Sequence, residues 1–330
     1  MKPKNCVFIQ LGITGTLIAG FTAQGQTKYS GDDWPETPTP TATNIVSTAA
    51  FQQVESETTA NAEPQEAAAP IIDQPSRFHL AIATEFTTAY FFRGIRQEDS
   101  GLIVQPYADA AIDAFRMEDA SVSLKAGFWN SYHDASTGAS SGDSFTKNWY
   151  ESDLYAGFGV SSGKWSFDAR YIWYTSPSNA FGTVDELDLS VAYDDTEWLG
   201  AWSMKPAATL ATEVGSNAAD GGNNGTYLQL SISPGLTFDA GSIKNVALTF
   251  PATVGLSLSD YYEGTGGEKD VLGYATVAAK LSVPLDVDAS WGAWTLSASV
   301  QALFLGDAAS TFNRANQSEI IGTVGISVGF

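Results

Sequence analysis

The chain has 330 residues, of which 44% are hydrophobic, 12% aromatic and only 16% charged, with a net charge of −21. The excess of 37 acidic over 16 basic side chains argues against binding to duplex nucleic acid, which needs basic patches facing the phosphates. One cysteine excludes a disulfide scaffold and a cysteine-ligated metal site. Ample apolar content excludes wholesale disorder, and no apolar run beyond the N-terminus is long enough for a transmembrane helix.

Residues 1–25 have the layout of a secretory signal peptide. Lys2 and Lys4 precede an apolar stretch from Cys6 to Phe21, and small residues follow at Ala23 and Gly25. We expect cleavage after residue 25, which leaves the exported chain without cysteine. The alternative is an uncleaved membrane anchor, for which the apolar stretch is short and interrupted by glycine and glutamine.

Residues 26–76 have a different composition, rich in proline, threonine, alanine and glutamate. They show no sustained hydrophobic periodicity, and acidic side chains strongly outnumber basic ones. This composition predicts a disordered, acidic linker that acts as a spacer.

Residues 77–330 alternate between apolar and polar positions up to the last residue. Period-two alternation indicates β-strands with one apolar and one polar face. The pattern predicts an all-β domain of about 12 strands, near residues 80–92, 102–113, 120–132, 148–160, 164–175, 185–193, 201–214, 226–238, 244–260, 271–285, 293–305 and 319–330.

The charged residues of these strands test the assignment. Six strands carry two internal charges each, and every such pair shares the polar face. A soluble β-sandwich also separates apolar from polar residues, but its charged face is the outer one. In a membrane barrel the outer face is the apolar one, because an arginine or lysine in the lipid costs about 2–4 kcal/mol. In a barrel the polar face lines the pore, and the predicted pore-lining residues are Glu85, Arg93, Asp109, Asp113, Lys125, Glu151, Asp153, Asp168, Arg170, Glu186, Asp188, Lys205, Glu213 and Lys280.

The connections between strands tend to alternate between short and long. Short turns at one end and long loops at the other are typical of outer-membrane barrels, and an even strand count places both termini at the short-turn end. We therefore predict a transmembrane antiparallel up-and-down β-barrel in the outer membrane of a Gram-negative-type bacterium, with both termini periplasmic.

Aromatic residues on the apolar face gather near the strand ends. Two such groups predict the aromatic belts of a barrel at the two membrane interfaces. The last segment ends in Phe330 with alternate apolar residues before it, which resembles the C-terminal signal that the barrel-assembly machinery reads. The predicted belt residues are Tyr90, Phe92, Tyr132, Tyr150, Trp173 and Tyr262 near the long loops, and Trp165, Tyr193, Trp202, Phe238, Trp294 and Phe330 near the short turns.

The stretch TTAYFFRGIRQEDSGLIVQPYADAAI, residues 87–112, resembles the first hairpin of the TorF-family porins. The resemblance rests on Tyr90 to Ile95, on Gln97 and on the Gln105-Pro106 pair, whereas Arg96 stands where a serine is expected. It implies a porin-like outer-membrane protein without an established substrate, and it does not extend to the acidic linker.

The predicted lumen suggests a channel. Twelve strands lie between eight-stranded barrels, which side chains fill, and sixteen-stranded porins, which hold water. Small inward residues over the last five strands favour space, and the wall carries nine acids against five bases. This predicts passive diffusion of small hydrophilic solutes with a weak preference for cations. Alternatively, the charges only pair across strands to satisfy a polar interior.

Other functions have weaker signals. An adhesin or surface receptor would use the long loops. An outer-membrane hydrolase would need a histidine beside a nucleophile, but His79 and His133 have no such partner signalled on a second strand. Residues 220–226 lack the spaced carboxylates of a calcium loop, and residues 264–269 lack the spacing of a phosphate-binding loop. We therefore expect no enzyme activity, cofactor or metal.

Overall fold

The computed structural model describes residues 76–117, 119–134 and 146–330. The predicted signal peptide and almost all of the predicted linker lie outside these residues. In the described part, no helix is long and apolar enough to cross a membrane. The short helical segments lie in connections between strands: α1 (Thr196–Leu199), η1 (Gly200–Trp202), η2 (Ala289–Trp291) and α2 (Asp307–Thr311).

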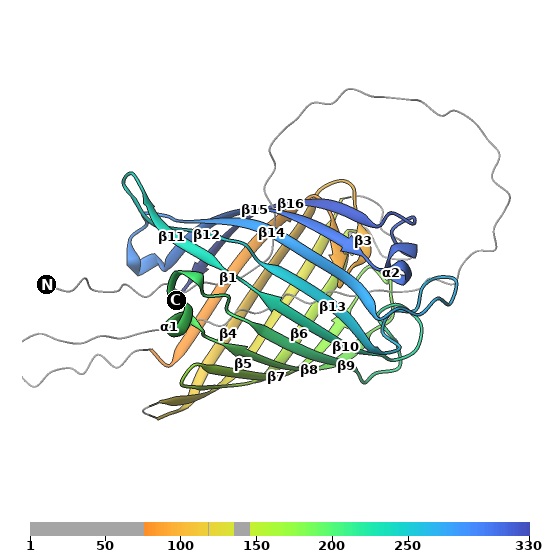
Figure 1. Ribbon diagram of the computed structural model, residues 1–330, viewed down its shortest axis with the longest axis horizontal. Coiled ribbons are helices and arrows are strands. Elements are labelled where there is room, and N and C mark those ends of the chain that lie inside the picture. The colour runs from red at the N-terminus through yellow and green to blue at the C-terminus, as the bar shows by residue number, and fades with distance from the viewer. Residues whose placement is uncertain (1–75, 118, 135–145) are drawn as a thin grey trace, which may run out of the picture.

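The strands form a closed antiparallel barrel (Figure 1). Strand β1 (Phe78–Thr87) pairs with β4 (Ile103–Arg116) on one side and with the last strand, β16 (Ser318–Gly329), on the other, so the sheet has no open edge there. Each strand between them pairs with its neighbours, in the order β5 (Ala120–His133), β6 (Trp149–Ser162), β7 (Trp165–Thr175), β8 (Val184–Tyr193), β9 (Ala207–Glu213), β10 (Thr226–Ile232), β13 (Ala252–Ser259), β14 (Leu272–Pro284) and β15 (Ala293–Leu305).

Two wall strands are interrupted at prolines. Strand β10 continues after Pro234 as β11 (Gly235–Ala240), and β12 (Ile243–Thr249) continues after Pro251 as β13. Proline has no N–H to donate to a neighbouring strand, so each strand is interrupted there. The carbonyl oxygens of Pro234 and Pro251 still accept from Phe250 and Ala278, at 2.7 and 2.8 Å. The fourteen segments of the sheet therefore make twelve wall strands, which confirms the predicted barrel. Beyond the break, β11 pairs only with β12, and all of its residues are exposed.

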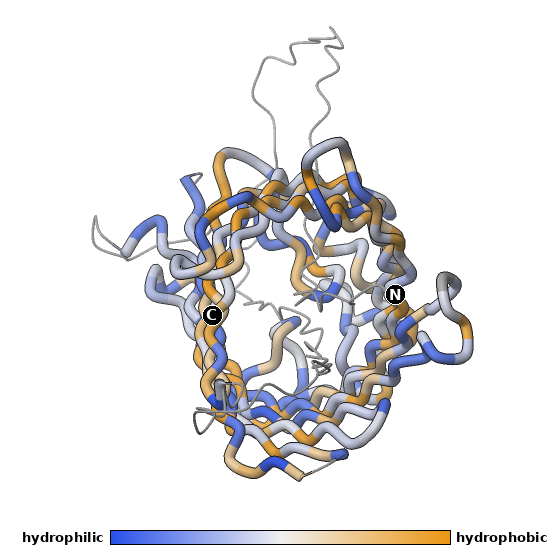
Figure 2. Tube along the Cα trace, turned by 90° about the vertical axis from the view of Figure 1, so that its left-hand side faces the viewer, coloured by the Kyte–Doolittle hydropathy of each residue, from blue (hydrophilic) through white to orange (hydrophobic). Residues whose placement is uncertain are grey.

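Side chains alternate between the two faces of the wall. On β6, Leu154 and Phe158 are exposed, whereas Glu151, Asp153 and Tyr155 are buried. Apolar residues thus face outward and polar residues inward, the arrangement expected of a barrel surrounded by lipid. Figure 2 shows the ring of strands seen from the end of the barrel.

The first strand is shorter than predicted. It ends at Thr87, and the chain then forms a separate two-stranded sheet, β2 (Tyr90–Phe92) and β3 (Ile95–Glu98). Arg93 and Gly94 have φ angles of 44° and 86°, the positive values that a tight two-residue hairpin turn requires. Placement of Tyr90 and Phe92 in an outer belt is therefore wrong, since they are only 5% and 1% exposed.

Three further predicted placements are wrong for local reasons. Tyr150 is buried because its ring stacks on His133, with centroids 4.6 Å apart. Tyr262 is buried because it lies beyond the end of β13 and packs against other tyrosines. Lys205 is exposed and precedes β9, which begins only after Pro206, so it does not lie on the barrel wall.

The remaining predicted belt residues lie on or near wall strands. Trp294 and Tyr193 are half-buried, and the others are exposed: Tyr132, Trp165, Trp173, Trp202, Phe238 and Phe330. Their position at membrane interfaces stays a prediction.

Phe158→Arg tests the outward face of the wall. Phe158 is exposed in the middle of β6, where an arginine would face hydrocarbon, so we expect a loss of about 2–4 kcal/mol in unfolding free energy, measured by urea unfolding in lipid vesicles. Leu236→Arg in the exposed β11 serves as the control, with an expected loss of about 0–1 kcal/mol. Equal losses for both variants would contradict the assignment of faces.

Candidate functional site

The hairpin β2–β3, called the plug below, crosses the inside of the barrel. It is rooted between the neighbouring strands β1 and β4, yet its tip reaches β8 on the far side of the ring. Arg93 makes two parallel hydrogen bonds there, from Nη1 to Oε2 of Glu186 at 2.6 Å and from Nη2 to Oε1 at 2.7 Å. Gly94 lies so close to β14 that a Cβ atom added to it would be 2.8 Å from the Cβ of Tyr274. The plug thus spans the lumen.

The guanidinium of Arg93 is the centre of a buried polar network. Its Nη1 also donates to the hydroxyl of Tyr261 at 2.6 Å, and its Cζ lies 4.2 Å from the ring centroid of Tyr227. The hydroxyl of Tyr174 donates to Glu186 at 2.7 Å. This bidentate pair with added hydrogen bonds is the geometry in which a buried ion pair offsets its desolvation.

A second arginine extends the network along the wall. Asp188, two residues from Glu186 on β8, lies 3.4 Å from Nη2 of Arg170 and 3.9 Å from Nη2 of Arg93. The predicted pore-lining residues Arg93, Arg170, Glu186 and Asp188 are therefore together, although they come from β7, β8 and the plug.

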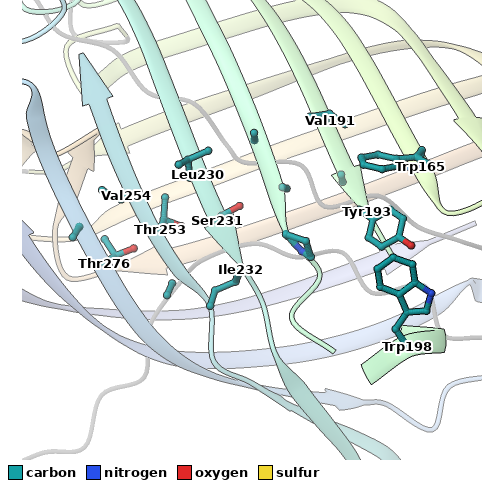
Figure 3. Close-up of a pocket in the computed structure, with 16 residues that line it drawn as sticks. Trp165, Val191, Tyr193, Trp198, Leu230, Ser231, Ile232, Thr253, Val254 and Thr276 are labelled. Atoms are coloured by element: carbon teal, nitrogen blue, oxygen red, sulfur yellow. The ribbon is translucent and has the colours of Figure 1, made fainter. Parts of the chain in front are cut away.

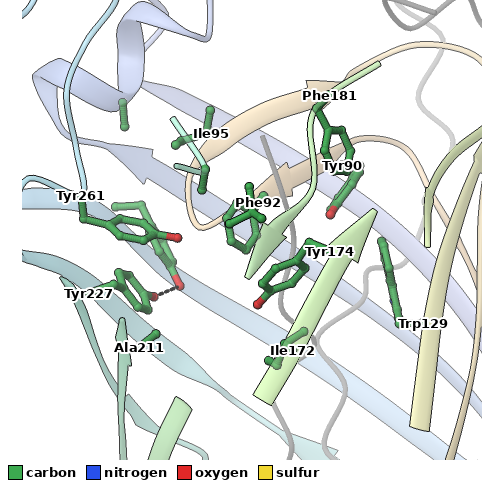
Figure 4. Packing of buried hydrophobic residues seen from close by; sticks show 14 of the residues in the cluster. Tyr90, Phe92, Ile95, Trp129, Ile172, Tyr174, Phe181, Ala211, Tyr227 and Tyr261 are labelled. Carbon is green, nitrogen blue, oxygen red and sulfur yellow. Dashed lines mark hydrogen bonds between the residues drawn. The ribbon is translucent and has the colours of Figure 1, made fainter. Parts of the chain in front are cut away.

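Aromatic side chains of the plug fill the space around this network (Figure 4). Tyr90 packs on Trp129 with ring centroids 5.3 Å apart, and Phe92 packs on Tyr174 at 6.1 Å. The hydroxyl of Tyr90 donates to Glu151 at 2.8 Å. The end of the barrel with the connections β1–β4, β5–β6 and β7–β8 is called the long-loop end. At this end the barrel contains a packed aromatic core.

Connections at the long-loop end hold the plug in place. The hydroxyl of Tyr262 donates to the backbone oxygen of Arg93 at 2.9 Å, and Arg314 forms an ion pair with Asp99 at 2.6 Å. Burial would raise the pKa of Asp99, but hydrogen bonds from Arg96 and Arg314 hold that pKa below its usual value. Asp99 is therefore ionised at neutral pH, as the ion pair requires.

Away from the long-loop end, the last two wall strands have small, polar inward residues. Inward residues of β15 and β16 there include Ser299, Thr323 and Gly325, and the charges of Glu85 and Lys280 attract one another. The expectation of few bulky inward residues on the last five wall strands holds at these positions. The same expectation is wrong at the long-loop end, where bulky inward side chains fill the lumen: Tyr227, Tyr274, Leu303 and Leu305.

The other predicted pore-lining residues have diverse partners. Lys125 binds Asp168 at 2.5 Å, and Asp113 binds Arg116 at 2.6 Å. Asp109 accepts a hydrogen bond from the hydroxyl of Tyr155. Two more acids complete the predicted set: Asp153, buried beside Glu151, and Glu213, which accepts from the backbone N–H groups of Ala219 and Gly225.

The rule that strand neighbours point to opposite faces does not apply to one residue near His133. Ser131 Oγ lies 2.8 Å from Nε2 of His133, two residues along β5 and therefore on the same face. The i, i+2 spacing was a usable signal, although neighbours at i+1 point to opposite faces. Ser131 is 0% exposed and His133 1%, and Tyr150 covers the imidazole. His79, the other histidine, binds Asp113 at 3.2 Å.

Within the described residues, no group of three or more His, Cys, Asp or Glu side chains has the arrangement of a metal site. The glycine-rich loop at residues 220–226 instead binds a neighbouring loop, since Asp220 accepts a hydrogen bond from the backbone N–H of Glu263 at 2.7 Å.

Comparisons with known proteins give structural likeness only. No family model and no curated protein matches the chain. An outer membrane channel from Pseudomonas putida F1 is similar with a TM-score of 0.42 and 10% identity, over 80% of this chain and 100% of that one. The NanC porin has a TM-score of 0.38 and 11% identity, over 76% and 98%. The β domain of the Bordetella autotransporter BrkA has a TM-score of 0.36 and 12% identity, also over 76% and 98%.

Arg93→Met tests the ion pair that holds the plug. The change leaves Glu186 buried without its guanidinium partner, so we expect a loss of about 3–5 kcal/mol in unfolding free energy. Arg96→Met is the matched control on the same hairpin. Arg96 pairs with Asp99 at a partly exposed site, where such a pair contributes about 0–1 kcal/mol.

Both variants are measured by urea unfolding in the same vesicles, together with Glu186→Gln and the double variant Arg93→Met/Glu186→Gln. The double variant should lose less than the sum of the single losses. Additive losses, or equal losses for Arg93→Met and Arg96→Met, would contradict the central role of the pair.

Proposed function

We propose that the chain is a porin-like channel of the outer membrane for passive diffusion of small hydrophilic solutes, and that the plug limits its conducting path. The observation that carries this proposal is the asymmetry of the lumen. Away from the long-loop end the inward residues of β15 and β16 are small and polar, whereas the long-loop end is filled by a hairpin that belongs to no strand ladder of the barrel wall. A purely structural interior would need no separate hairpin to fill one end.

The charge inside the barrel supports a weak preference for cations. With Lys205 outside the wall, nine predicted acids remain against four bases: Arg93, Lys125, Arg170 and Lys280. Several of the acids bind neutral donors, such as the hydroxyls of Tyr90 and Tyr155. A net-negative, low-dielectric passage attracts cations and repels anions.

The resemblance to TorF-family porins supports the same function. Its core, Tyr90 to Ile95, forms most of the plug, so the likeness lies in the element that limits the path. We further propose that a signal peptide directs export, that both termini are periplasmic, and that the barrel-assembly machinery recognises Phe330.

The alternatives are an adhesin or receptor and, less favoured, a hydrolase. The burial of Ser131 and His133 argues against hydrolysis. An adhesin would bind a partner through its loops without conducting ions.

Removal of the plug tests the channel. We expect replacement of residues 90–98 by a short Gly/Ser linker to raise single-channel conductance severalfold in planar bilayers, because the plug spans the lumen. A variant with a shortened β11–β12 hairpin, whose outer strand is exposed, controls for loss of chain length and should conduct as the parent does. Folded protein that does not conduct even without the plug would refute the channel and leave the adhesin.

Glu85 and Lys280 provide a matched pair for the selectivity. In a potassium chloride gradient, Lys280→Gln should move the reversal potential towards greater cation selectivity, and Glu85→Gln should move it the opposite way. Both residues are buried in the same half of the lumen, so a non-specific effect on structure would shift the two variants alike. Anion selectivity of the parent, or shifts in one direction, would refute the proposed preference.

A further inference from the structure

The outer surface of the barrel carries an apolar groove of about 1060 Å³ near the short-turn end (Figure 3). It lies over β7, β8, β9, β10, β13 and β14. The surface is hollowed there because three outward positions hold small side chains: Ala208, Ala252 and Ala275. Alternation on β8 places Val191 and Tyr193 on the face opposite to Glu186 and Asp188, so the groove is on the outside of the wall.

Three aromatic residues stand together at one end of the groove. Trp165 and Tyr193 face each other across β7 and β8 with ring centroids 4.6 Å apart, and Trp198 of α1 lies 5.6 Å from Tyr193. Trp165 and Trp198 are exposed. Tryptophan and tyrosine at such positions typically lie at the boundary between hydrocarbon and headgroups.

The connection between β8 and β9 places one positive and one negative charge beside this end. Lys205 is exposed and directly precedes Pro206, which lines the groove. Burial would raise the pKa of Asp194, but hydrogen bonds from Thr196 and the charge of Lys205 lower it, so Asp194 is ionised.

The neighbouring charges are already engaged. Asp195 accepts hydrogen bonds from the backbone N–H groups of Met204 and Lys205, at 3.0 Å for each, and Lys164 forms an ion pair with Glu197. Asp194 also accepts a hydrogen bond, from the backbone N–H of Thr196 at 2.9 Å. Lys205 and Asp194 thus present one positive and one negative charge beside the groove.

We infer that the groove binds one zwitterionic phospholipid, with its acyl chains over the alanine floor, its phosphate on Lys205 and its ammonium group on Asp194. The inference rests on the proposed placement of the barrel in a membrane, where the surroundings of an outward groove are hydrocarbon. Its volume lies slightly above the roughly 300–1,000 Å³ usual for ligand sites. A lipid with net negative charge fits less well, because it brings no cation to Asp194.

Native mass spectrometry of the full chain extracted from membranes tests the acyl-chain site. Ala208→Trp fills the groove floor, and we expect at least tenfold less co-purified phosphatidylethanolamine than with the unaltered chain. Ala156→Trp, at an exposed outward alanine on β6, adds the same bulk elsewhere on the lipid face and should retain the lipid. Equal retention by all three proteins, or equal loss from both variants, would overturn the site.

Headgroup variants test the two charges. Lys205→Gln should lower retention of both phosphatidylethanolamine and phosphatidylglycerol, whereas Asp194→Asn should shift the preference towards phosphatidylglycerol. A preference for phosphatidylglycerol in the unaltered chain would refute the zwitterionic assignment. Dimers that Ala208→Trp dissociates would show that a second copy fills the groove instead. Bilayer conductance of the same proteins reports on the channel separately, so conduction without bound lipid would refute the lipid site alone.

Discussion

Closure of the sheet between β1 and β16 is the constraint on which the other features depend. In hydrocarbon an unpaired backbone N–H or C=O costs several kcal/mol, so a sheet that crosses a membrane must pair its first strand with its last. Closure divides the side chains into an outward and an inward set along every strand. The inward set then has to satisfy its own charges in a confined space, and this requirement leads directly to the plug.

The plug resolves the charge problem at the long-loop end. Glu186 and Asp188 are neighbours on one face of β8, and two buried carboxylates so close repel each other. Arg93 enters from the other side of the lumen to neutralise Glu186, and Arg170 approaches Asp188 from β7. The wall itself supplies only one of these two cations. The plug is thus an electrostatic part of the barrel as well as a steric one.

The sequence predicted the barrel well because period two is a direct consequence of strand geometry. The prediction of strand ends failed where the alternation continues through a turn. The stretch from Leu80 to Phe92 alternates without a break, so nothing in the periodicity shows that the chain leaves the wall after Thr87. The hairpin had a signal of its own, a glycine at position 94 between two short extended segments, but the unbroken alternation before it hid this signal.

Partners within the site were beyond prediction for a different reason. The alternation of polar and apolar residues places Arg93 and Glu186 inside the barrel. Their contact, however, depends on how far a hairpin reaches across the ring, which no local pattern encodes. Tyr261 and Tyr262 follow β13 in a connection, so alternation does not govern where they point. Lys205 was wrongly placed on the wall because the spacing of apolar residues suggested a strand that runs through Pro206. Proline starts a strand more readily than it continues one, and β9 begins only after it.

Three prolines mark the side of the barrel where the strands are interrupted, and the groove lies on that side. Pro234 and Pro251 interrupt their strands, and β11 pairs with β12 alone. Pro206 delays the start of β9, and the connection before it pairs instead through the backbone oxygen of Met204, which accepts from Ser233 at 2.7 Å. At this end a helical connection with exposed tryptophans therefore replaces regular wall. The connection that Pro206 ends thus places Lys205 and Trp198 beside the groove in which we propose that a lipid binds.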